Sequence, residues 1–184
     1  MDLAEMHKSS KGYKYFLVFV DHYSKWTYTI PLKNKEGSSV ATGLEKIILP
    51  ACHTLPQWIL SDNGKEFKNR EVSAVLKKYG IAQDFSPAYF PQNNGLAERT
   101  IGTIKSLLRA TGGDWEENLA ATTIAYNSTY HESIDMSPAD VMVGKTARVI
   151  IPNKDLNLVK NHIPFKIGDK VLRKVHAAAK MGMK

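Results

Sequence analysis

The chain has 184 residues with 43% apolar content, enough for one buried core, and its single cysteine, Cys52, excludes internal disulfides and any zinc site that needs two cysteines. No apolar run reaches the roughly 18 residues of a membrane span and no signal segment opens the sequence, so we expect a soluble intracellular protein without membrane contacts. The net charge of +7 comes from residues 145–184, which hold ten Lys and Arg but two acids; this segment suits non-specific contact with a phosphate backbone, although a solvated linker explains residues 145–162 equally well.

The first part of the sequence predicts an antiparallel meander. Aromatic and β-branched residues dominate residues 13–21 and 25–32, a composition that favours strands. A weaker apolar run at residues 2–6 precedes them, and turn residues at 9–12 lie between. The turn between the last two strands carries three residues that we interpret as packing and turn residues rather than ligands: His22, Tyr23 and Trp26.

The middle of the sequence alternates helices with strands. Apolar residues recur at helical spacing over residues 36–49, which Pro50 ends, and over residues 68–79, which Gly80 ends. Each helix is followed by a short apolar strand, at residues 56–61 and 81–85. This alternation of helices and strands is typical of an α/β sheet with helices on both faces.

A loop and two long helices complete the pattern. Residues 86–95 are rich in Pro and Asn and predict a long loop. The two helices are predicted at residues 96–110 and 115–130. Gly112-Gly113 separates them, Asp114 is a suitable N-cap for the second helix, and His131 is interpreted as a cap at its other end.

Three acids occupy positions that suggest a two-metal site. Asp2 lies in the first strand, Asp62 opens Asp62-Asn63-Gly64 at the end of an apolar strand, and Glu98 lies near a helix start, with 35 residues between it and Asp62. Taken alone, Asp62 is a common turn residue and Glu98 is a favourable charge at a helix N-terminus. Together they supply the oxygen ligands with which two Mg²⁺ ions perform phosphodiester chemistry, at the strand ends where α/β sheets place ligands.

These acids and their neighbours resemble the catalytic core of retroviral and LTR-retrotransposon integrases, with gypsy-type elements the most similar. The resemblance rests on Asp62-Asn63-Gly64 and on the segment from Tyr89 to Arg99 around Glu98. Three further stretches support it: Tyr15–Trp26, Tyr126–His131 and Ser137–Asp140. The resemblance covers nearly the whole chain and implies a ribonuclease-H-like α/β fold, in which helices flank a mixed five-stranded sheet with the first acid on its central strand.

The same resemblance divides the chain into three parts. Residues 1–145 correspond to the catalytic core and residues 146–162 to a linker. Residues 163–184 look like the start of a small C-terminal β-barrel that stops before it closes. The His/Cys zinc module that precedes related cores is missing, so we expect the piece to be incomplete.

The resemblance implies metal and DNA roles for particular side chains. Asp2, Asp62 and Glu98 hold two Mg²⁺ or Mn²⁺ ions, with Asp21 as the reserve for Asp2. The loop before Glu98 grips a DNA end, where a tyrosine stacks on an unpaired base, although a plain polar surface loop is the alternative. Cations on the following helix meet phosphates, whereas Arg99 is less easily placed. The candidate DNA contacts are Tyr89, Gln92, Asn94, Lys105 and Arg109.

The implied activity is that of a two-metal polynucleotidyl transferase. The ions activate water to trim the end of the element DNA, then activate the exposed 3′-hydroxyl to attack target DNA, without a covalent protein intermediate. The implied partners are element-end DNA, target DNA and further copies of the chain in a dimer or larger assembly. The substrate implies a nuclear location, preceded by a polyprotein or particle precursor.

Two alternatives remain open. A domesticated or truncated integrase remnant would bind DNA or protein without cutting, although the three intact acids argue against this alternative. A ribonuclease of the same fold would cleave RNA in a hybrid with DNA, but the loop from Pro91 to Glu98 favours an integrase.

Overall fold

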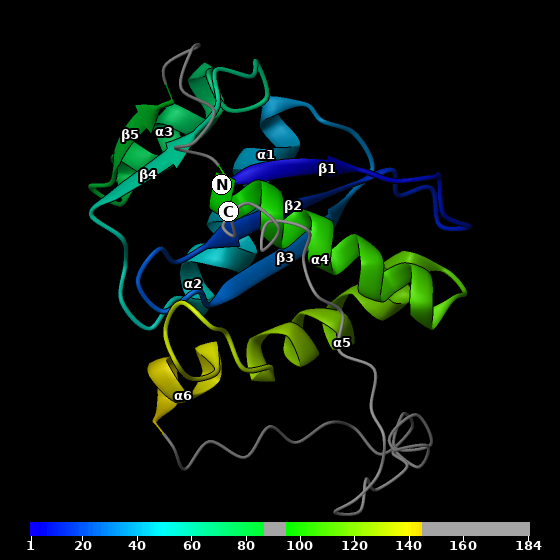
Figure 1. The fold of residues 1–184 in the computed structure, drawn as a ribbon. Helices are drawn as coiled ribbons and strands as arrows, with labels where there is room; N and C mark the ends of the chain where they lie inside the picture. Colours follow the sequence, from blue (N-terminus) through cyan, green and yellow to red (C-terminus); the bar gives the residue numbers. More distant parts are fainter. Residues whose placement is uncertain (87–94, 145–184) are drawn as a thin grey trace, which may run out of the picture. The chain divides into compact units, whose positions relative to one another are not determined.

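The computed structural model, which describes residues 1–86 and 95–144, opens with the predicted antiparallel meander. β1 (Asp2–Glu5), β2 (Tyr15–Val20) and β3 (Thr27–Leu32) form one sheet with β2 in the middle (Figure 1). The apolar run at the start of the sequence is weak, yet it forms β1 because all four of its residues pair with β2. Strand pairing therefore holds the first candidate acid in place.

A strand-helix-strand unit forms a second, smaller sheet. β4 (Trp58–Ser61) and β5 (Ala82–Phe85) run parallel, and α3 (Arg70–Lys78) connects them. All five predicted strands are present, and their hydrogen bonds group them as a three-stranded and a two-stranded sheet. The backbone nitrogen of Met1 donates to the carbonyl oxygen of Leu60 at 2.6 Å, which brings the start of β1 next to β4.

The helix predicted over residues 36–49 is divided into three pieces. α1 (Gly37–Gly43) is followed by a π-helical turn, η1 (Leu44–Ile48), and by the short α2 (Leu49–Ala51). Pro50 does not end the helix as predicted, because it lies in the first turn of α2. Proline is tolerated in the first turn of a helix, where its missing N–H would have no partner. The wider π-helical turn η1, just before α2, accommodates Pro50, which cannot donate a hydrogen bond.

Helices follow β5 in the predicted order. α4 (Gly95–Thr111) and α5 (Trp115–Ser128) are the two long helices, and the short α6 (Pro138–Val143) is an addition to the prediction. α6 begins at a capping box in which the side chains of Ser137 and Asp140 each accept the other's backbone N–H. No helix in the described part of the chain is long and apolar enough to cross a membrane.

The contacts at the two ends of α5 differ from the sequence prediction. Asp114 occupies the N-cap position, but its carboxylate bonds the hydroxyl and backbone N–H of Ser10 and makes no cap bond to the helix. At the other end the C-cap is Thr129, so the predicted cap role of His131 is wrong. The backbone N–H of His131 instead donates to the carbonyl of Met136 at 2.9 Å. Asp114 thus bonds a residue distant in sequence instead of the helix, whereas the C-terminal cap is local, because the N–H of Thr129 donates to the carbonyl of Tyr126 at 3.1 Å.

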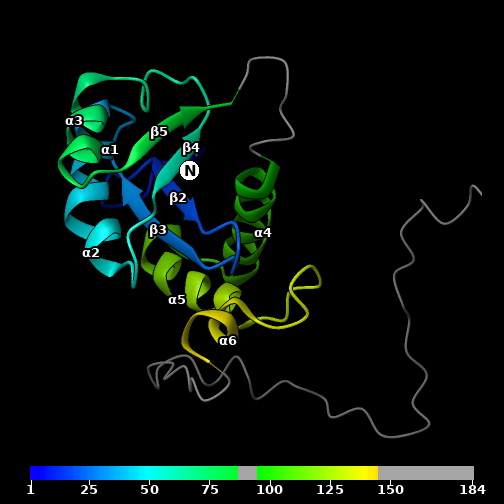
Figure 2. The same ribbon diagram turned by 90° about the vertical axis from the view of Figure 1, so that its left-hand side faces the viewer.

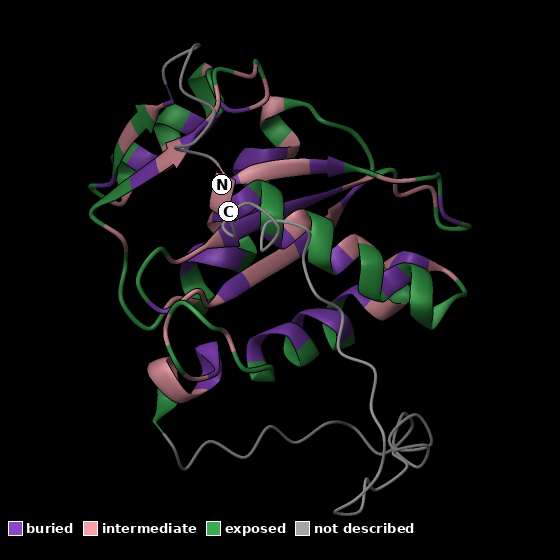
Figure 3. Cartoon of the chain, viewed as in Figure 1, coloured by how far each residue is buried: buried purple, intermediate pink, exposed green. Residues whose placement is uncertain are grey.

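β2 contributes to the core on both of its faces, because side chains alternate along a strand. Leu17 and Phe19 face the layer of α1, η1 and α3, whereas Phe16 and Val18 face α4 and α5, as Figure 2 shows for the helices. Phe16, Leu17 and Val18 are fully buried, and Figure 3 shows buried positions along the same strand. Each buried side chain of this size contributes roughly 1.5–3 kcal/mol.

Candidate active site

The three candidate acids come from three different elements. Asp2 begins β1, and one of its carboxylate oxygens accepts the N–H of Leu3 at 2.7 Å. Asp62 directly follows β4 and accepts the N–H of Gly64 at 2.9 Å. Glu98 lies in the first turn of α4 and is exposed. Backbone N–H groups one or two residues further along the chain thus orient two of the three carboxylates, those of Asp2 and Asp62.

The charges of two of these acids act on the third, Asp2. Burial raises the pKa of Asp2, and the negative charges of Asp62 and Glu98 raise it further, while the N–H of Leu3 opposes the change. Asp62 and Glu98 therefore each lie within electrostatic range of Asp2. They concentrate negative charge where β1 begins.

This donor set suits a divalent cation in kind. Carboxylate oxygens are the ligands that Mg²⁺ and Mn²⁺ prefer, and a bound cation would offset the repulsion around Asp2. Among residues 1–86 and 95–144, no three His, Cys, Asp or Glu side chains are arranged closely enough to hold one ion. The acids are neighbours rather than a closed ligand cluster.

Asp21, the reserve candidate, is occupied in the turn between β2 and β3. Its carboxylate accepts the backbone N–H of Ser24 at 2.8 Å and the hydroxyl of the same residue at 2.5 Å. The N–H of Asp21 also donates to the carbonyl of Trp26 at 2.9 Å. These bonds give Asp21 a structural role in the turn.

Asn63 supports Asp62, a contribution that the sequence analysis missed. The side-chain amide of Asn63 donates to the carbonyl of Ser86 at 2.8 Å, which links the loop after β4 to the end of β5. A Cβ added at Gly64 would lie 2.9 Å from a carboxylate oxygen of Asp62, so a side chain there would press on the acid. The Asp62-Asn63-Gly64 motif was the available signal, but only the fold reveals the partner of Asn63.

The predicted DNA contacts are divided between described and undescribed residues. Lys105 is half-buried and Arg109 is exposed, both on α4 beyond Glu98. The charges of Lys14 and Lys105 both lower the pKa of Glu5 in β1, which shows that Lys105 lies near this strand. The other three predicted contacts lie outside the described residues: Tyr89, Gln92 and Asn94.

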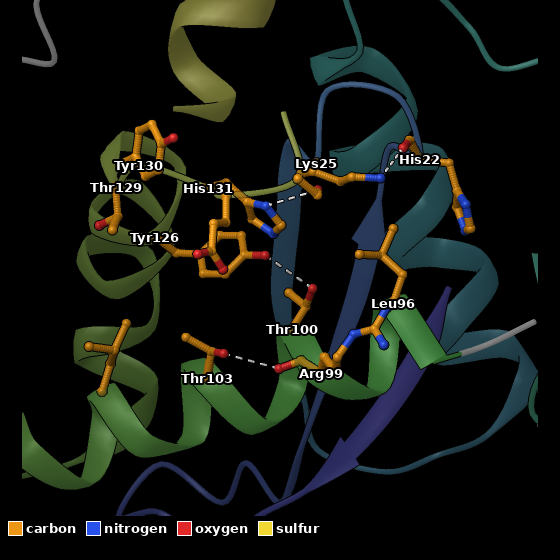
Figure 4. A pocket seen from close by; sticks show the side chains of 13 residues that line it. His22, Lys25, Leu96, Arg99, Thr100, Thr103, Tyr126, Thr129, Tyr130 and His131 are labelled. Atoms are coloured by element: carbon orange, nitrogen blue, oxygen red, sulfur yellow. Dashed lines mark hydrogen bonds between the residues drawn. The ribbon is translucent and has the colours of Figure 1, made fainter. Parts of the chain in front are cut away.

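A hollow of about 870 Å³ opens beside the first turns of α4 (Figure 4). Lys25, Arg99 and His131 line it from three separate parts of the chain. A hydrogen bond of 3.2 Å between the hydroxyls of Thr100 and Tyr126, both buried, joins α4 to α5 in its wall. These residues meet only in the folded chain, so no local motif indicates the hollow.

The turn between β2 and β3 forms one side of this hollow. Lys25 adopts a φ of 63°, in the left-handed region, and its ammonium donates to the carbonyl of His22. Burial lowers the pKa of His22, and the charge of Lys25 lowers it further. Trp26 packs against Tyr28 with ring centroids 6.2 Å apart, whereas Tyr23 is 83% exposed and is a turn residue only.

Comparison with known proteins identifies the domain. Residues 1–91 match the family described as Integrase core domain. Over 154 residues, or 82% of its length, the chain is 30% identical to the Gag-Pol polyprotein of avian reticuloendotheliosis virus, of which it covers 13%. Over 120 residues, or 62% of its length, it is 38% identical to the Pol polyprotein of radiation murine leukemia virus (strain Kaplan), of which it covers 20%.

This chain carries a retroviral-type integrase core domain. It corresponds to a small part of these viral polyproteins, so their other activities are not transferred to it. The resemblance to integrases is confirmed, while the particular similarity to gypsy-type elements stays a prediction.

A solved structure confirms the fold class of the integrase core. The crystal structure of the catalytic core domain of BIV integrase superimposes with a TM-score of 0.63 at 21% sequence identity. The superposition covers 77% of this chain and 90% of that one. At this identity the comparison establishes the ribonuclease-H-like α/β fold alone.

Asn127 belongs to Tyr126–His131, one of the stretches on which the integrase resemblance rests, and its hydrogen bonds show what this stretch does in the fold. Its side-chain carbonyl accepts the N–H of Thr27 at 2.9 Å, and its amide donates to the carbonyl of the same residue at 2.8 Å. Both residues are buried. Asn127 thus satisfies both backbone groups at the first residue of β3 and fixes α5 against the sheet that carries Asp2.

Proposed function

We propose that this integrase core trims the 3′ end of element DNA and then joins that end to target DNA, by two in-line displacements at phosphorus. The observation that supports the proposal most directly is that Asp2, Asp62 and Glu98 come from separate elements while the charges of Asp62 and Glu98 both act on Asp2. The integrase core family consists of polynucleotidyl transferases, which supports the same class of reaction.

Asp2, Asp62 and Glu98 would hold two Mg²⁺ or Mn²⁺ ions. Such ions, when bound, lower the pKa of an attacking water or hydroxyl and stabilise the charge on the leaving oxygen. The backbone bonds to Asp2 and Asp62 orient both carboxylates in advance, which reduces the ordering required on binding. Asn63 holds the Asp62 loop against the end of β5.

Other side chains of the proposal bind and position DNA. Lys105 and Arg109 are one helical turn apart, about 6 Å along α4, and offer their charges to the phosphate backbone on the same helix that carries Glu98. Our proposed contacts to the DNA end are Tyr89, Gln92 and Asn94. Self-association into a dimer or larger assembly would hold two DNA ends at once.

The compartment and the division of the chain belong to the same proposal. The relatives are parts of Gag-Pol and Pol polyproteins, which is consistent with release from a polyprotein precursor. Action on chromosomal target DNA would take place in the nucleus. A linker at residues 146–162 and a barrel start at residues 163–184 stay predictions.

The alternative function is a non-catalytic remnant that binds DNA or a protein partner. The observation in its favour is that the three acids, all within the described residues, do not form a closed ligand cluster. A remnant of this kind would bind DNA without requiring metal and would not join strands.

Strand transfer on a short duplex with a recessed 3′ end tests the proposal, with Mg²⁺ or Mn²⁺ present. We expect activity from the wild type and a loss of at least about 100-fold in Glu98→Gln, with DNA affinity retained, since the amide keeps the size of the side chain but removes a ligand charge. Glu71→Gln, at an acid in the first turn of α3, is the matched control. Undiminished turnover by Glu98→Gln would refute the assignment, and calorimetry without any metal binding would favour the remnant.

A further inference from the structure

The hollow beside α4 brings two permanent cations together from elements distant in sequence. Lys25 belongs to the turn between β2 and β3, and Arg99 lies in the first turns of α4. The ammonium of Lys25 donates to the carbonyl of His22, which uses one of its three N–H groups. Two positive groups with donors to spare therefore face one cavity.

The hollow opens on a different face of α4 from Glu98. Four of the residues of α4 that line it recur every three or four positions and share one face: Leu96, Arg99, Thr103 and Leu107. Arg99 follows Glu98 directly in sequence but points about 100° around the helix from it. The cavity of about 870 Å³ is within the size range of small-molecule sites and has room for a nucleotide unit. A strand of DNA engaged at Glu98 would have to pass around the first turns of α4 to reach it.

The backbone at Lys25 indicates that its side chain is there for a reason other than folding. Its φ of 63° is a conformation that costs an L-residue about 1–2 kcal/mol and that glycine adopts freely. Asp21 maintains the turn by accepting the N–H of Lys25 at 2.9 Å through its carbonyl, a bond that any residue at position 25 except proline would donate. A lysine at a position that favours glycine points to a use for its charge.

The remaining lining combines apolar and polar side chains. Leu96 and Leu107 lie in it, and the hydroxyls of Thr100 and Tyr126 are buried and bond each other. The one acid in the lining, Glu132, is exposed, so the two cations supply the groups that would contact phosphate.

We propose that this hollow binds the sugar-phosphate backbone of DNA at a distance from the reacting phosphate, with Lys25 and Arg99 paired to its phosphate oxygens. The inference rests on the proposed function for DNA as the ligand, but the binding it assigns is independent of catalysis. Both element-end and target DNA carry this backbone, so the experiment separates the two sources.

Equilibrium binding without metal, in EDTA, provides the test on two DNAs: a short duplex with a recessed 3′ end, and a closed circle without ends. We expect Lys25→Gly/Arg99→Gln to bind at least about 10-fold more weakly at 100 mM NaCl, with a salt dependence lower by about one or two phosphate contacts. A loss confined to the recessed duplex assigns the hollow to element-end DNA, and a loss confined to the circle assigns it to target DNA.

The control removes the same charge elsewhere. Lys46→Gln/Lys77→Gln changes two exposed lysines on η1 and α3, outside the hollow, and should bind both DNAs nearly as the wild type does. Lys25→Gly should melt at or above the wild-type temperature, because it relieves the left-handed lysine, and Arg99→Lys should restore most of the affinity. A purely structural role would not separate stability from affinity in this way.

Equal affinities of the hollow variant and the control variant on both DNAs would overturn the inference. That result alongside Glu98-dependent strand transfer by the wild type would leave the proposed function standing. The converse result, weakened binding without any strand transfer, would retain the hollow as a DNA site and remove the proposed reaction.

Discussion

Asp2 is placed where its negative charge is unfavourable. Burial raises the pKa of its carboxyl above the ordinary value of 3.8, and the charges of Asp62 and Glu98 act in the same direction. The folded state therefore holds a proton on Asp2 more tightly than the unfolded state does. Stability is lost as the pH rises from the unfolded pKa through the higher folded pKa, and the penalty is complete above both.

Asp2→Asn should consequently stabilise the metal-free fold at neutral pH. The amide oxygen still accepts the N–H of Leu3, so the change removes the charge while the local hydrogen bond remains. Urea denaturation in EDTA should show the variant above the wild type at pH 7, with the difference shrinking towards pH 3. An unchanged difference across this range would mean that the charge of Asp2 is not the cause.

Added metal should reverse this order. Mg²⁺ or Mn²⁺ would raise the melting temperature of the wild type, because a ligand that binds only the folded state stabilises it, and would have little effect on Asp2→Asn. Asp84→Asn, at an exposed acid of β5, is the control and should stay within about 0.5 kcal/mol of the wild type in both conditions.

At the scale of elements, the sequence predicts what depends on local composition. β2 and β3 lie within the predicted ranges because aromatic and β-branched runs favour strands wherever the chain places them. η1 could not be predicted, because it depends on how the chain between Gly43 and Pro50 packs on β3. The N-cap role of Asp114 failed for a similar reason, since its partner Ser10 lies 104 positions earlier.

The candidate site likewise contains residues that local sequence predicts and contacts that only the fold reveals. Asp62 and Glu98 were predicted because each belongs to a motif that is continuous in sequence, and Asp2 because it lies in the first strand; their roles stay predictions. The bond from Asn63 to Ser86 joins segments that only folding brings together. The same holds for the hollow, where Lys25 and Arg99 lie 74 positions apart along the chain.

Gly43 offers a test of how closely α1 packs on β3. A Cβ at this position would lie 2.1 Å from the Cδ1 atom of Ile30, which is buried and has little room to move. Gly43→Ala should therefore destabilise the fold by about 1–3 kcal/mol in urea denaturation, although alanine is the better helix former. Gly102→Ala is the matched control in α4: nothing lies within 4 Å of its added Cβ, so it should stabilise by up to about 1 kcal/mol.

A second substitution isolates the cause. Ile30→Val removes the Cδ1 atom that the new methyl group meets, so the double variant Gly43→Ala/Ile30→Val should lose less stability than the sum of the single variants. Strict additivity would show that the clash does not explain the glycine.

At the scale of the whole molecule, the net positive charge is concentrated in one part of the chain. The chain divides into two units, Met1–Ile150 and Ile151–Lys184. The second unit contributes eight Lys and Arg against two acids, whereas residues 1–144 are close to neutral. We therefore expect the second unit to carry much of the attraction to nucleic acid.

Truncation after Ile150 tests this division. The shortened chain should keep the melting temperature of the wild type to within a few degrees, because all the described core residues remain. Its affinity for DNA of any sequence should fall, and the slope of log Kd against log salt should become shallower, by about 0.9 for each phosphate that the protein no longer neutralises. Replacing the eight Lys and Arg of residues 151–184 by Gln in the full chain should reproduce the weaker binding if charge is the cause. A truncated chain with unchanged affinity and slope would show that the DNA is held by the core alone, through α4 and the hollow beside it.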